Sequence, residues 1–183
     1  MKYNKEWLLN QETVENDFLF FWGHQKQDFI TKSCLSQWYE CQFSDLHSTY
    51  TSMEQYMMAK KALLFDDINS FNQIMNVNDP KVCKSLGRKI LNFDNDVWDK
   101  YKTDIVVNGN MLKFSQNKKL KDFLLYTGNK VLVEASPYDK IWGIGMYQSD
   151  INSINPLKWN GLNLLGFCLM EVRDIINKSV KIS

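Results

Sequence analysis

Three segments of the chain place ionisable side chains among aromatic ones, at residues 54–62, 93–98 and 134–145. Within the first segment, Glu54 and Lys61 are seven residues apart. An α-helix turns by about 100° per residue, so this spacing returns Lys61 to within about 20° of Glu54, roughly 10 Å further along the axis. A carboxylate and an amine can therefore line one groove without touching, and the aromatic residues beside them can bind a planar ring.

Several common catalytic motifs are missing from the sequence. It contains no P-loop, no G-x-S-x-G turn and no dinucleotide-binding fingerprint, since Gly143 and Gly145 form only a Gly-x-Gly. The four cysteines show no C-x-x-C spacing, and only His24 and His47 could join them in a zinc site. We therefore expect reduced thiols, no metal and no cofactor.

Length and charge restrict the class of protein further. The chain has 183 residues, and its 22 Lys and Arg against 21 Asp and Glu give a net charge of +1. This balance does not indicate a broad basic surface for nucleic acid, although it is compatible with a local basic patch. The N-terminal residues show no signal-peptide core, and the apolar run at 18–22 is too short to cross a bilayer. We expect a cytoplasmic protein that does not associate with membranes.

The elements that must position these side chains are mostly helices. The sequence predicts short strands at residues 18–22, 38–43 and 131–133. It predicts helices from Thr51 to about Leu64, from Asp79 to about Leu91, from Asp94 through Ile105, from Asn117 to Gly128, and from Leu162 to Asn177. The pattern is typical of an α+β fold, in a single helix-rich domain with a few short strands.

Several short blocks also occur in a fixed order along the chain. They are Phe21-Trp22-Gly23-His24, residues 34–39, Glu54-Gln55-Tyr56 with Lys61-Ala62, Leu86-Gly87-Arg88, and residues 125–128, 134–145 and 159–166. Together they make the chain resemble the NADAR family, also called YbiA-like. The resemblance implies an N-terminal extension at 1–17, a NADAR domain with a YbiA-like α+β fold at 18–177 and a C-terminal tail at 178–183.

The resemblance implies an N-glycosidase that cleaves the bond between a nitrogenous base and a phosphorylated ribose, without a metal. Two substrate classes are associated with the family: ribosylamino-pyrimidine phosphates of riboflavin biosynthesis, and ADP-ribose attached to guanine in nucleic acid. The alternative is a non-catalytic reader module that binds ADP-ribose or NAD. A reader would use the same aromatic residues and Arg88, but it would not need Glu54 or Lys61.

Glu54, Lys61 and Asp139 are the catalytic candidates that the resemblance favours. Glu54 could stabilise positive charge at the anomeric carbon or activate water, whereas spacing alone favours a capping box with Thr51. Lys61 could hold a phosphate or the leaving group, attack the anomeric carbon as an amine, or be an ordinary solvated lysine. The amine role requires a lowered pKa. Adjacent Lys60 points about 100° away on a helix.

The other candidates would bind substrate, and each has a structural alternative. Trp98 and Trp142 could stack on the base or pack in the core. Asp139 could orient ribose or serve as a turn residue, and Glu134 could bind ribose hydroxyls or pair with Arg88. Arg88 could clamp a phosphate, and Asn163 could bind the ligand or cap the last helix. The remaining candidates form the substrate-binding set of the resemblance: Trp22, Gly23, His24, Gly143 and Gly145.

Overall fold

The computed structural model of the chain describes residues 1–180, with side chains up to residue 179. It divides into two compact units, each described here separately. Unit 1 consists of Met1–Ser36 and Lys118–Ser183, and unit 2 consists of Gln37–Asn117. The predicted domain limits stay a prediction. Of the predicted C-terminal tail, residues 181–183 lie outside the described residues.

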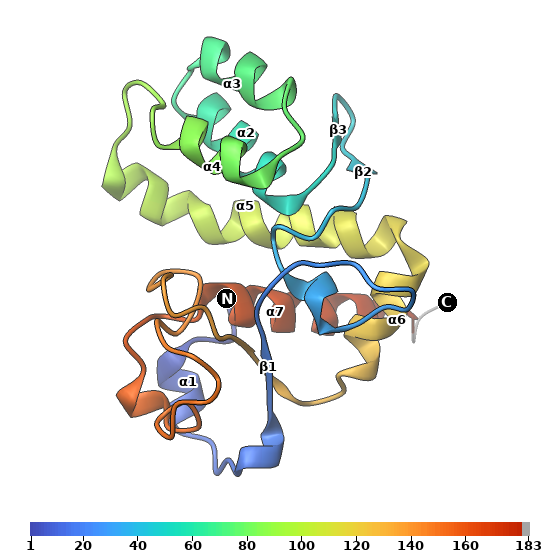
Figure 1. Cartoon of the computed structure of the whole chain (residues 1–183), viewed down its shortest axis with the longest axis vertical. Coiled ribbons are helices and arrows are strands. Elements are labelled where there is room, and N and C mark those ends of the chain that lie inside the picture. The colour runs from blue at the N-terminus through green and yellow to red at the C-terminus, as the bar shows by residue number, and fades with distance from the viewer. Residues whose placement is uncertain (181–183) are drawn as a thin grey trace. The chain divides into compact units, whose positions relative to one another are not determined.

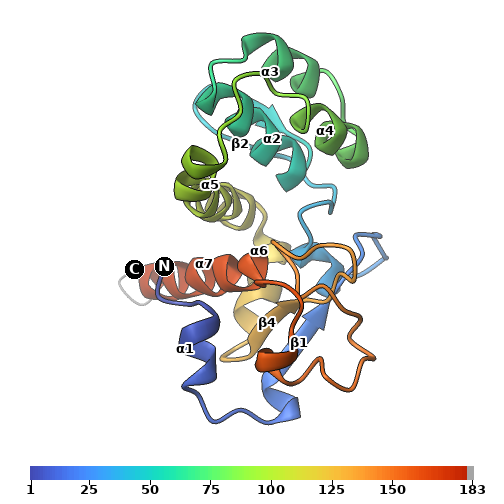
Figure 2. The same ribbon diagram turned by 90° about the vertical axis from the view of Figure 1, so that its left-hand side faces the viewer.

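Unit 1 is built on two short parallel strands. Its elements are α1 (Lys5–Leu9), β1 (Phe18–Phe21), α6 (Lys118–Tyr126), β4 (Val131–Glu134) and α7 (Leu164–Val180), with 3₁₀ helices at Glu15–Asp17, Lys32–Leu35 and Pro156–Lys158. Strands β1 and β4 pair from Phe18 with Val131 to Phe21 with Glu134. Figure 2 shows these two strands side by side, with α7 in the same unit.

The core of unit 1 lies where β4 packs on α7. All four residues of β4 are buried, as a strand covered on both faces requires. The α7 residues that meet this core are the apolar stripe predicted from helical spacing: Leu165, Leu169, Val172 and Ile176, all buried. Burial of this stripe is the main reason that residues 164–180 form a helix here.

Unit 2 is a cluster of helices with one small hairpin. Its elements are β2 (Phe43–Ser44), β3 (Thr49–Tyr50), α2 (Met53–Leu64), α3 (Ile68–Met75), α4 (Pro80–Gly87) and α5 (Asn95–Gln116). Helix α2 contacts α3, α4 and α5, and is therefore the centre of the unit (Figure 1). Gly87 allows α4 to approach α2 closely, since a Cβ at this position would lie only 2.0 Å from the Met58 sulfur.

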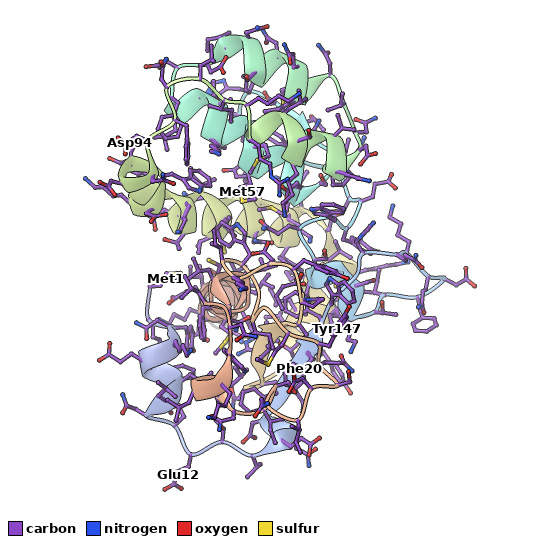
Figure 3. All side chains as sticks on the ribbon, turned by 60° about the vertical axis from the view of Figure 1, so that its left-hand side comes forward. Met1, Glu12, Phe20, Met57, Asp94 and Tyr147 are labelled. Atoms are coloured by element: carbon purple, nitrogen blue, oxygen red, sulfur yellow. The ribbon has the colours of Figure 1, made fainter. Side chains whose placement is uncertain are left out.

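Polar caps fix where the helices of unit 2 begin. The Asp79 side chain accepts a hydrogen bond from the Lys81 amide, and Pro80 occupies the first helical position, as predicted. Asp94 accepts from the Val97 amide at 2.9 Å and lies at the start of α5 (Figure 3). The helix predicted from each of these caps is confirmed.

Several predicted boundaries are wrong. Residues 38–42 form a turn and an irregular segment instead of a strand, so that β2 begins only at Phe43. Helix α4 ends at Gly87, four residues before the predicted end at Leu91. Asn117 does not cap α6 through its side chain, which donates to the carbonyls of Gln42 and Lys113. Helices α1 and α3 were not predicted, and α7 begins at Leu164 instead of Leu162.

Candidate active site

Glu54 lies in the first turn of α2, but it does not cap that helix. The N-cap is Ser52, whose hydroxyl accepts from the Gln55 amide at 3.2 Å. Gln55 then reaches back, and its side-chain oxygen accepts from the Thr51 amide at 2.8 Å. The predicted capping box between Thr51 and Glu54 is therefore wrong, because Ser52 caps the helix and Gln55, not Glu54, bonds back to the Thr51 amide. The Glu54 carboxylate is left for another role.

The Glu54 carboxylate is buried, with only 2% of the residue exposed. The indole Nε1 of Trp38 donates to its Oε2 at 3.2 Å. The Glu54 amide donates to the carbonyl of Gln37 at 2.9 Å. Burying a carboxylate costs free energy unless hydrogen bonds stabilise it. The turn at residues 37–38 supplies such a bond through Trp38.

Lys61 lies about two turns further along α2 than Glu54, beside the end of α4 and the start of α5. Its Nζ donates to the Gly87 carbonyl at 2.9 Å. The same nitrogen lies 4.0 Å from the centre of the Phe93 ring and 5.5 Å from that of Trp98. Partial burial lowers the pKa of Lys61 below the ordinary value of 10.5. The structure therefore brings Lys61 and Trp98 together, in the kind of desolvated setting that a nucleophilic lysine needs.

The neighbours of Lys61 in the sequence face different surroundings. Lys60 pairs with Asp45 at 2.7 Å, which confirms that it points away from Lys61. Arg88 follows the carbonyl that Lys61 contacts, but its own side chain is exposed at the end of α4. Its assignment to phosphate binding stays a prediction.

Cys83 gives a chemical probe of the burial around Glu54. Burial, together with the negative charges of Glu54 and Asp79, raises the pKa of the Cys83 thiol to about 11. The thiolate is the reactive form, so at pH 8 we expect Cys83 to react with iodoacetamide far more slowly than an unfolded cysteine. Peptide mass spectrometry of native and denatured protein measures this difference. Equal labelling of Cys83 in the two samples would contradict the described packing of α4.

In unit 1, Asn163 connects the end of β4 to the start of α7. Its Oδ1 accepts from the Glu134 amide at 2.9 Å, and its Nδ2 donates to the Leu132 carbonyl at 2.9 Å. The residue is fully buried and adopts a φ of 54°, a left-handed conformation that asparagine tolerates better than most residues. These bonds engage both polar atoms of its side chain, which supports a structural role for Asn163.

We expect Asn163→Ala to lower the free energy of unfolding by about 2 kcal/mol or more. The change leaves a buried N–H and a buried carbonyl without their partner, and each such loss costs about 1–3 kcal/mol. Alanine at this φ adds strain. Chemical denaturation of the variant measures the effect. A loss below about 0.5 kcal/mol would show that the two bonds contribute little to the stability of unit 1.

Asp139 shapes the loop that follows β4. Its Oδ1 accepts from the amides of Ile141, at 3.0 Å, and Trp142, at 2.8 Å. This is the turn role that was the predicted alternative for Asp139. Gly143 packs tightly here, since a Cβ would lie 2.8 Å from the Glu134 carbonyl. The side chain of Trp142 is buried, and Gly145 has a φ of 68°.

The loop after β1 exposes an aromatic side chain. Trp22 is 48% exposed, and its ring lies 5.7 Å from that of Tyr147 and 6.3 Å from that of Tyr138. Gly23 and His24, the next two residues, are also exposed. Parallel strands end at the same edge of a sheet, so the loops that follow β1 and β4 both begin at one edge of the two-stranded sheet.

Sequence reasoning missed two side chains that the structure joins to the candidates. Trp38 bonds to Glu54, and Phe93 covers Lys61. Both stand in segments that the sequence singled out, but their partners lie at least 16 residues away along the chain. A contact between residues so far apart in the chain cannot be predicted from the spacing of neighbouring residues.

In residues 1–180, no group of three or more His, Cys, Asp or Glu side chains is arranged to hold a metal ion. No helix in the same residues is sufficiently long and apolar to cross a membrane. The four cysteines are present as thiols.

Comparison with known proteins identifies the family of the chain and agrees with its fold. The family model for the NADAR domain matches residues 20–177. The chain therefore belongs to the NADAR domain family.

Particular relatives define the class of enzyme more closely. N-glycosidase R617 of Acanthamoeba polyphaga mimivirus is 47% identical over 167 residues, which are 88% of this chain and 98% of that protein. The chloroplastic riboflavin biosynthesis protein PYRR of Zea mays is 29% identical over 74% of this chain, although the match spans only 21% of PYRR. The NMR structure of YbiA from Escherichia coli superposes with a TM-score of 0.71 at 23% identity, over 93% of this chain and 90% of YbiA.

These findings confirm the predicted α+β fold and the predicted class of enzyme. The chain is an N-glycosidase, and the relatives do not favour the alternative of a non-catalytic reader.

Proposed function

We propose that this N-glycosidase hydrolyses the bond between a nitrogenous base and a phosphorylated ribose, with Glu54 and Lys61 as catalytic residues. The observation that carries the proposal is the pair on α2: a buried carboxylate held by an indole, and a lysine whose pKa is lowered by burial. On this one helix, Glu54 would stabilise positive charge and Lys61 would act as the nucleophile.

The chemistry of the reaction accounts for the carboxylate. Breaking the C1–N bond sends its electron pair to the base nitrogen and leaves C1 electron-poor. A carboxylate beside C1 stabilises that positive charge, or takes a proton from the water that attacks C1. Water supplies oxygen to C1 and a proton to the base, so that ribose phosphate and free base are the products. Glu54 has this role in the proposal.

Lys61 gives the reaction a covalent route. A ribosylamine opens to an imine, and the neutral Lys61 amine adds to its C1. The base leaves as a free amine with the electron pair of the C1–N bond and a proton, and C1 stays bound to Nζ as a new imine. Water then hydrolyses this imine, which releases ribose phosphate and restores Lys61. A lowered pKa supports this route, because only the neutral amine attacks.

An aromatic residue beside Lys61 is the proposed platform for the base. Trp98, whose ring lies near Lys61, would stack on the base. Within unit 1, taken by itself, the resemblance assigns substrate binding to Trp22, Glu134 and Trp142 and a catalytic role to Asp139. Because Asp139 accepts a hydrogen bond from the Trp142 amide, its proposed contribution is to orient Trp142.

Two substrate classes are proposed, and both carry ribose phosphate on an amine of a base. One is a ribosylamino-pyrimidine phosphate, in line with the name of the Zea mays relative. The other is ADP-ribosylated guanine in nucleic acid. A net charge of +1 does not favour extensive duplex binding, but one extruded nucleotide needs only a small basic rim. The four thiols support a cytoplasmic location for either reaction.

The test is a time course of base release by the purified chain. The protein is incubated separately with ADP-ribosyl-guanosine and with a ribosylamino-pyrimidine phosphate, and free base is measured by mass spectrometry. We expect release from at least one compound, and the preferred compound identifies the substrate class. Tight binding of ADP-ribose without base release from either compound would overturn the proposal in favour of a reader.

A further inference from the structure

We propose that Trp38 is the positioning residue of Glu54. The inference rests on the proposed function, because it concerns how the carboxylate of that site is held. Trp38 is half-buried in the turn that precedes β2, and its Nε1 donates to Glu54 Oε2 at 3.2 Å. The bond joins residues 16 positions apart within unit 2.

The turn holds Glu54 at two points. The carbonyl of Gln37 accepts from the Glu54 amide at 2.9 Å, while the next residue, Trp38, bonds to the Glu54 carboxylate. The first turn of a helix has amides without partners inside the helix, and Gln37 satisfies one of them. Backbone and side chain of Glu54 are therefore positioned by two consecutive residues of the same turn.

The chemistry of indole determines the form of Glu54 that this turn favours. An indole N–H can only donate. A donor aimed at a carboxyl oxygen stabilises the ionised form, and hydrogen bonds to a charged acceptor are about twice as strong as neutral ones. Trp38 thus orients the Glu54 carboxyl group with one oxygen held as an acceptor. A carboxylate stabilises charge at C1 or accepts a proton, and it does not donate one.

The ring of Trp38 is held from a second element. Lys84 of α4 places its Nζ 5.9 Å from the centre of the Trp38 ring. A cation over the face of an indole is attracted to it. The ring is therefore contacted from α4 as well as from the carboxylate on α2.

The test compares Trp38→Phe with Trp159→Phe. The first variant keeps an aromatic ring and removes the donor. The second is a matched control in unit 1, because the Trp159 Nε1 donates to the Ser153 carbonyl at 2.7 Å and not to a carboxylate. We expect Trp38→Phe to lower kcat for base release by about 10- to 100-fold, with KM within about twofold of the wild type. Trp159→Phe should leave kcat within about twofold.

A spectroscopic measurement keeps the inference testable even if a variant unfolds or the substrate is wrong. In ¹⁵N-labelled protein, the indole N–H proton of Trp38 should move upfield in Glu54→Gln, because an amide oxygen is a weaker acceptor than a carboxylate. An unmoved indole signal, or a kcat of folded Trp38→Phe within twofold of the wild type, would overturn the inference. Wild-type protein that releases no base, with an indole signal that does move, would instead overturn the proposed function and leave the pairing established.

Discussion

Glu54→Gln should lower the rate of base release by about 10³-fold while the chain stays folded. The amide has nearly the shape of the carboxylate and still accepts a bond from Trp38, but it carries no charge to stabilise C1 and cannot act as a base. Loss of one such preorganised group typically costs about 10²- to 10³-fold in kcat, and loss of a general base about 10²- to 10⁴-fold. Single-turnover measurement of free base gives the rate directly.

Glu12→Gln is the control for this variant, because Glu12 is an exposed carboxylate of unit 1. It should release base at the rate of the wild type. Thermal melting of both variants separates loss of fold from loss of chemistry. If folded Glu54→Gln kept more than a tenth of the wild-type rate, Glu54 would not be the catalytic carboxylate.

Lys61→Arg should lower kcat by at least about 10²-fold and abolish trapping by borohydride. Arginine keeps the positive charge but has no nucleophilic amine at neutral pH. With wild-type protein, borohydride added during turnover should reduce the imine and leave ribose phosphate covalently on Lys61. Mass spectrometry of the intact protein and of its peptides detects the adduct and its position.

Lys60→Arg is a closely matched control, since Lys60 is the adjacent residue and pairs with Asp45. It should retain both turnover and the adduct on Lys61. The pH dependence provides a second measurement. Because burial lowers the pKa of Lys61, the neutral amine forms at lower pH than in an ordinary lysine, and kcat should rise with pH and level off below 10.5. Active turnover without any adduct would leave Lys61 as a positioning group for phosphate or base.

Local signals in the sequence predict some elements well. Asp79 followed by Pro80, and Asp94 three residues before Val97, each identify a helix start because the cap and the helix are neighbours in the chain. The predicted N-cap of α2, Thr51, lies one residue before the observed N-cap, Ser52. Two capping patterns overlap here, Thr51 with Glu54 and Ser52 with Gln55. The choice depends on Gln55, whose side chain also donates to the carbonyls of Ile74 and Val77 on another part of unit 2.

Residues 38–43 were predicted as a strand from their aromatic composition, which does not distinguish a strand from a buried turn. In the structure, only Phe43 of this segment enters a strand, whereas Trp38 bonds to the first turn of α2. The same tertiary contact explains why the sequence pointed to Glu54 but not to Trp38. Helical spacing places Glu54 and Lys61 on one face, whereas the indole partner is recognised only when the turn and the helix are seen together.

The most direct test of the central claim, that this chain breaks the C1–N bond of a ribosylated base, is the mass of the products. Wild-type protein is incubated with each of the two proposed compounds until the reaction is complete, and every product is identified by mass spectrometry. The account predicts free pyrimidine base with ribose phosphate from one compound, or guanosine with ADP-ribose from the other, with all phosphate bonds intact. Unchanged compounds, or fragments that keep the base joined to the phosphorylated ribose, would contradict it.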